Sequence, residues 1–199
     1  MAEDRQERFQ KHGENFYKTL GLCIAEWARV DDALFRIFRD CLGPHEQSAI
    51  IYYRSPSLDA RFGLTNEIVR SVLPKRQRKS GGHDHPAVKA WVAAHAGYKD
   101  LLAVRRRVAH HPVGMMVQGM GALGLLVGEP PDAWFVIDVG QHERARVKES
   151  NLKAMTISDL HRHQVAVANL RDRLHGFLQG VLIKHAQESL SPNPLRSPG

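Results

Sequence analysis

The chain has 199 residues, enough for one domain with its own buried core. Its 43% hydrophobic and 25% charged residues exclude disorder or a collagen-like structure for most of the chain. Its two cysteines are too few for a disulfide framework or a four-cysteine zinc site. The net charge of +7 is either solubility charge or an attraction for polyanions such as nucleic acid.

The first half of the chain predicts three helices. Residues 15–42 form a long amphipathic helix that ends at Gly43, and residues 45–53 form a short one. Ser57 is the expected cap of a third helix over residues 58–73. The apolar stripe expected on the first helix is Phe16, Leu20, Ile24, Trp27, Leu34 and Phe38.

A basic, glycine-containing loop over residues 75–85 is predicted to follow. Pro86 suits the first position of a fourth helix. This helix is expected to end near His110, because Pro112 disfavours helical geometry at the residue before it.

Residues 113–150 are predicted to be a small β-hairpin insertion. The segment contains five glycines between Gly114 and Gly128, which is too many for a helix. Residues 134–139 are strand-like, and residues 144–148 are the expected pairing partner. No apolar run approaches the about 18 residues of a membrane helix.

Thr156 or Ser158 is expected to cap a last long helix, with a tail over residues 189–199 that we expect to be disordered. The predicted fold is therefore mainly α: an up-and-down helical bundle, residues 1–188, with the hairpin inserted before its last helix. The charged N-terminus lacks the apolar core of a signal peptide, so we expect a cytoplasmic protein with no membrane partner.

Two charged residues fall on apolar helix faces. Asp31 lies between Trp27 and Leu34 on the first stripe, and Arg105 has Leu101, Leu102, Val108 and Ala109 as its helical neighbours. A buried charge is costly unless it is paired. We therefore predict that Asp31 and Arg105 form an ion pair between their helices.

Arg105 and His110 form an R-x4-H pattern, and Arg106 and His111 form a second one. With Trp27 and Asp31 on an earlier helix, this pattern and the order of the elements resemble the HEPN superfamily. Many members of this family are metal-independent ribonucleases of helical fold, and they commonly dimerise. The resemblance covers residues 15–188 as a pattern, and its sharpest part is the short segment from Arg105 to Pro112.

The resemblance implies an endoribonuclease of a toxin or defence system that cleaves RNA by attack of the 2′-hydroxyl. His110 would transfer the proton and Arg105 would hold the phosphate, because histidine titrates near neutrality and the guanidinium binds phosphate oxygens in pairs. Asp31 would orient Arg105. Arg106 stands where the family has a small polar residue, and His111 follows where it has a glycine, so both are accessory candidates.

Other functions remain open at this stage. The alternative is a non-catalytic helical module that binds nucleic acid or a protein partner, such as an antitoxin, through a basic face; a structural homodimer is a third possibility. No cofactor or metal is expected, because His83 and His85 lack a second ligand pair and the glycine motif over residues 119–124 lacks a flanking strand and helix. Trp134 is the candidate for base stacking, and Trp27 and Trp91 are expected in the core.

Overall fold

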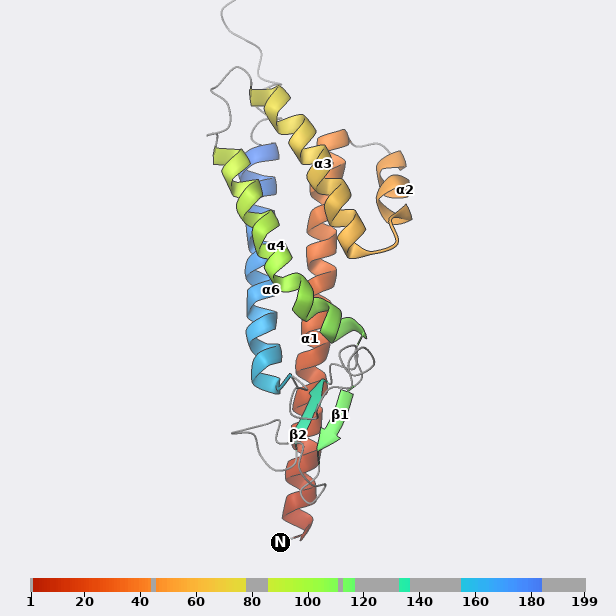
Figure 1. Ribbon diagram of the computed structural model, residues 1–199, viewed down its shortest axis with the longest axis vertical. Helices are drawn as coiled ribbons and strands as arrows, with labels where there is room; N and C mark the ends of the chain where they lie inside the picture. Colours follow the sequence, from red (N-terminus) through yellow and green to blue (C-terminus); the bar gives the residue numbers. More distant parts are fainter. Residues whose placement is uncertain are drawn as a thin grey trace, which may run out of the picture. The chain divides into compact units, whose positions relative to one another are not determined.

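The computed structural model describes residues 2–43, 46–77, 86–110, 113–116, 133–136 and 155–183, and this part of the chain is mainly helical, as predicted (Figure 1). In it, no helix combines the length and the apolar character that crossing a membrane requires. The elements are α1 (Ala2–Leu42), α2 (Glu46–Arg54), α3 (Leu58–Gln77), α4 (Pro86–His110), β1 (Val113–Met116), β2 (Ala133–Val136), α6 (Ile157–Phe177) and the π-helix η3 (Leu178–Ile183).

The residue contacts divide the chain into two compact units. Unit 1 comprises residues 1–27 and 99–168, and unit 2 comprises residues 28–98 and 169–199. The helices α1, α4 and α6 therefore each contribute one part to unit 1 and another part to unit 2.

The helix ends follow local chemistry at most of the predicted positions. Gly43 ends α1 with a φ of 101° and donates its N–H to the Arg39 carbonyl at 2.8 Å, a conformation that favours glycine. The Ser57 hydroxyl accepts the Ala60 N–H at 3.1 Å and caps α3. Pro86 is the first residue of α4 and His110 is its last, as predicted.

Thr156, rather than Ser158, caps α6. Its hydroxyl accepts the Asp159 N–H at 3.2 Å, and the Asp159 carboxylate accepts the Thr156 N–H at 3.0 Å. This reciprocal pair is a capping box. Burial opposes the charged form of Asp159, but the hydrogen bonds from Thr156 and Arg162 outweigh it and lower the pKa of that carboxyl.

Two predicted helix boundaries were wrong. Helix α1 begins at Ala2 rather than at residue 15, because the preceding charged residues are good helix formers although they show no apolar stripe. Helix α3 continues past Pro74 to Gln77, so it includes the start of the predicted loop over residues 75–85. A proline in the last turn removes one backbone donor, and the helix tolerates that loss there.

The strand predicted at residues 134–139 is present at Ala133–Val136, and its partner in the structure is Val113–Met116. The two strands run antiparallel, with Val113 opposite Val136 and Met116 opposite Ala133; Figure 1 shows them as neighbouring arrows. The partner predicted at residues 144–148 lies outside the described residues, as does the tail over residues 189–199.

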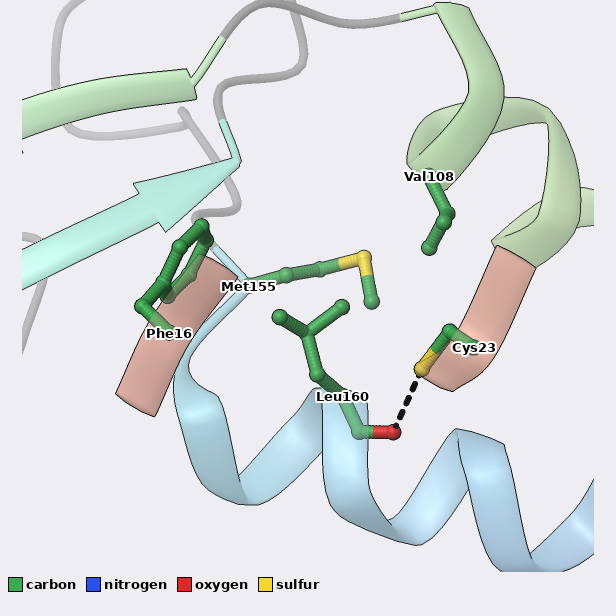
Figure 2. Close-up of a cluster of buried hydrophobic side chains, with 5 residues drawn as sticks. All are labelled: Phe16, Cys23, Val108, Met155 and Leu160. Atoms are coloured by element: carbon green, nitrogen blue, oxygen red, sulfur yellow. Dashed lines mark hydrogen bonds between the residues drawn. The ribbon is translucent and has the colours of Figure 1, made fainter. Parts of the chain in front are cut away.

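The core of unit 1 brings together three helices. Phe16 and Cys23 of α1, Val108 of α4, Leu160 of α6 and the preceding Met155 form one buried cluster (Figure 2). The Cys23 thiol donates a hydrogen bond to the Leu160 carbonyl at 3.1 Å. Burial raises the pKa of this thiol to about 11, so Cys23 acts as a packing residue.

The core of unit 2 is built around stacked aromatic rings. The Phe62 ring stacks on Tyr98 with centroids 3.8 Å apart and lies 5.9 Å from Trp91, which in turn contacts Phe177 at 5.2 Å. The Trp91 indole donates to the Asn66 side chain at 3.0 Å, so its buried N–H is satisfied. Trp91 is thus a core residue, as predicted.

Candidate functional site at the end of helix α4

Three of the predicted functional residues, Arg105, Arg106 and His110, occupy the last two turns of α4. Arg105 and Arg107 are half-buried, Arg106 is exposed, and His110 is the last residue of the helix. Cationic side chains are favoured near a helix C-terminus by about 0.3–1 kcal/mol each. The negative end of the helix dipole therefore favours the three arginines, and they concentrate positive charge at this end of α4.

Arg105 is oriented by an aromatic ring. Its guanidinium carbon lies 5.8 Å from the ring centroid of Trp27, over the indole. Such a cation–π contact stabilises an arginine by about 0.5–2 kcal/mol, depending on how well water is excluded. Trp27 is itself only 5% exposed, so the indole is a rigid support for a half-buried cation.

The indole of Trp27 is in turn hydrogen-bonded to a buried histidine, His163. The Trp27 indole Nε1–H donates to His163 Nε2 at 3.0 Å, and the two ring centroids are 5.8 Å apart. His163 is 5% exposed, and this burial lowers the pKa of its imidazole from 6.5 to about 4. The ring is therefore neutral at pH 7, with Nε2 accepting and its proton on Nδ1.

Asp31 belongs to a different group of residues. Its Oδ2 forms an ion pair with Arg61 of α3, and its Oδ1 accepts the Tyr52 hydroxyl of α2 at 2.7 Å. Arg61 also donates to the Ser55 carbonyl at 3.2 Å, and its guanidinium lies 5.3 Å from the ring centroid of Tyr53. These contacts join three helices of unit 2.

The prediction that Asp31 needs a partner was correct, but the partner is Arg61 and not Arg105. The sequence pattern placed Asp31 on the buried stripe, and its side chain is 22% exposed, which is partly rather than fully buried. A helix pattern identifies a charge that must be neutralised, yet it does not identify which of several arginines does so. Burial, with Asp31 as its hydrogen-bond acceptor, also raises the pKa of Tyr52 far above its ordinary value.

Several candidate residues lie outside the described part of the chain: His83, His85, His111 and residues 119–124. Nothing is described of the side chains of His110 and Trp134, which lie in a helix and a strand. Within the described ranges, no three histidine, cysteine or acidic side chains converge in a way that could hold a metal ion.

The residue that sequence reasoning missed is His163. The signal was available, because His163 falls on the buried stripe of the last helix, between Leu160 and Val167. The site therefore contains a cation, Arg105, that lies over the ring of Trp27, and the indole of Trp27 is hydrogen-bonded in turn to His163.

Comparison of the chain with protein-family models, curated proteins and solved structures gave no match.

Proposed function

We propose that this protein is a metal-independent endoribonuclease, of the kind found in toxin or defence systems, with its site at the C-terminal end of α4. The observation that carries the proposal is the ordered Arg105 guanidinium on Trp27, five residues before the terminal His110 of the same helix. The fold class, mainly helical, is compatible with the HEPN resemblance of the sequence.

In the proposed reaction, Arg105 binds the scissile phosphate. The next residue, Arg106, is exposed and supplies a second cation for phosphate binding. His110 takes the proton of the 2′-hydroxyl, and that oxygen attacks the adjacent phosphorus. The bond to the 5′ oxygen breaks, and this oxygen leaves with a proton from solvent or from His111. The products are a 2′,3′-cyclic phosphate and a 5′-hydroxyl end.

Around the helix axis, Arg105 and His110 are separated by about 140°. A homodimer that places the ends of two α4 helices side by side would combine Arg105 of one copy with His110 of the other. We therefore propose that the site forms between the two copies of a homodimer. Asp31 is not part of this site, since its carboxylate pairs with Arg61 and accepts a hydrogen bond from Tyr52.

The test is RNA cleavage in EDTA by the wild type, Arg105→Ala and His110→Ala, on structured and unstructured RNA. Both variants should lose activity, and Arg36→Ala, which removes an exposed arginine of the same charge, should retain it. Cleavage that persists in both site variants would exclude this site. Persistent cleavage in His110→Ala alone would move the proton transfer to His111, which His111→Ala then checks.

The second candidate is nucleic-acid binding without cleavage. It is favoured by the exposed Arg106 and the net charge of +7, because phosphate binding needs only the cations. It predicts salt-dependent RNA binding that Arg105→Ala weakens, with intact RNA recovered after incubation.

A further inference from the structure

We propose that His163 is a positioning residue that holds Arg105 in its phosphate-binding orientation through Trp27. The inference rests on the proposed function for the role of Arg105, but the structural relay itself stands on contacts within unit 1. The three residues come from three helices: His163 from α6, Trp27 from α1 and Arg105 from α4.

The first step of the relay fixes the indole. An indole ring in a core has one polar atom, Nε1–H, and leaving it unsatisfied would cost about 1–3 kcal/mol. The acceptor at 3.0 Å is His163 Nε2, and the Cys23–Leu160 hydrogen bond lies one helical turn earlier on both helices. Two successive turns of α1 are thus joined to two successive turns of α6, which leaves the indole little freedom to rotate.

The second step fixes the guanidinium. An arginine side chain has several rotatable bonds and gains little from a weak contact unless the surface it lies on is rigid. The Trp27 ring offers one face to Arg105, and the neighbouring Val104 and Val108 of α4 pack into the buried cluster of Phe16, Met155 and Leu160. The packing of Val104 and Val108 therefore fixes the α4 backbone, and the hydrogen bond to His163 fixes the indole. Arg105, which is half-buried, extends from the one and lies over the other.

The state of His163 matters to the relay. Only a neutral imidazole can accept from the indole at Nε2, and burial of His163 favours that neutral form. A side chain that lacks an acceptor at this point releases the indole, whereas glutamine offers its side-chain oxygen near the position of Nε2. His163→Met and His163→Gln therefore form a matched pair: one fills the space without a strong acceptor, and the other restores the acceptor.

The experiment reads Arg105 in two ways, without and with RNA. By NMR, the δ protons of Arg105 should show an upfield ring-current shift from Trp27 that is lost in His163→Met and retained in His163→Gln. With single-stranded RNA, the plot of log K for RNA binding against log salt concentration should become less steep in Arg105→Ala and in His163→Met. The expected change in the slope corresponds to the loss of about one phosphate contact. The slope should be no less steep in the double variant than in either single variant, because both changes remove the same contact.

The outcomes separate the two proposals. An Arg105 ring-current shift that persists in His163→Met overturns the positioning role, whatever RNA does. A shift that responds to His163, in a protein whose RNA binding ignores Arg105→Ala, supports the relay and overturns the proposed function. If His163→Met fails to fold, Trp27→Phe replaces it, because phenylalanine has no indole N–H. The relay predicts that Trp27→Phe makes RNA binding less salt-dependent by as much as Arg105→Ala does. A salt dependence that Arg105→Ala reduces and Trp27→Phe leaves unchanged contradicts the relay.

Discussion

Acid should destabilise this protein through His163 in a narrow pH range. The imidazole titrates at about 4 in the folded chain against an ordinary pKa of 6.5, because burial disfavours its charged form. Between these two values the unfolded chain binds a proton that the folded chain does not. The free energy of unfolding is therefore at its full value above pH 6.5 and falls as the pH approaches 4, by about 3 kcal/mol.

His163→Gln isolates this contribution, since glutamine keeps an acceptor for Trp27 and does not titrate. The two proteins share every other titrating group, so the difference between their free energies of unfolding cancels those groups. Urea unfolding followed by far-UV circular dichroism at several pH values should show the difference shrinking by about 3 kcal/mol from pH 7 to pH 4. Parallel curves across that range would refute a buried, neutral His163.

Three further predictions concern the remaining buried polar groups. Asp31→Ala and Arg61→Ala should each destabilise the protein, and their double-mutant cycle should give a coupling of about 1–2 kcal/mol for this half-buried pair; additive effects in urea unfolding would contradict the ion pair. Tyr52→Phe removes the hydroxyl that donates to Asp31 and should cost about 1.5–3 kcal/mol, measured as a lower unfolding free energy; an unchanged value would show the bond to be energetically silent. Cys23, with a pKa of about 11, and the buried Cys41 should react with a thiol reagent at pH 8 only on unfolding, and rapid labelling of the folded protein would contradict their burial.

Local chemistry made the helix boundaries predictable where a specific residue marks them. Gly43, Ser57, Pro86 and Thr156 act on their own backbone or on residues within one turn, so their roles can be read without the rest of the fold. The start of α1 was missed because its polar first turns are helical by propensity and carry no periodic signal.

The residues of the site were predictable only in part, because the side chains that contact each other are determined by how the helices pack in the folded chain. Periodicity correctly placed Trp27 in the core, but Ile24 of the same predicted stripe is exposed and Cys23 takes its place. Arg105 was expected against a carboxylate and lies against an indole instead. Both solutions satisfy a half-buried cation, and a single sequence does not distinguish them.

The division of the helices between two units has a consequence for how the chain acquires its structure. Each unit is made of two segments that are far apart in the sequence, with residues 28–98 separating the two parts of unit 1. During synthesis, unit 1 lacks its α6 segment until residues up to 168 have emerged, and unit 2 lacks its own until later still. No single cut therefore releases either unit as a continuous fragment, and both must assemble late, around long closed loops.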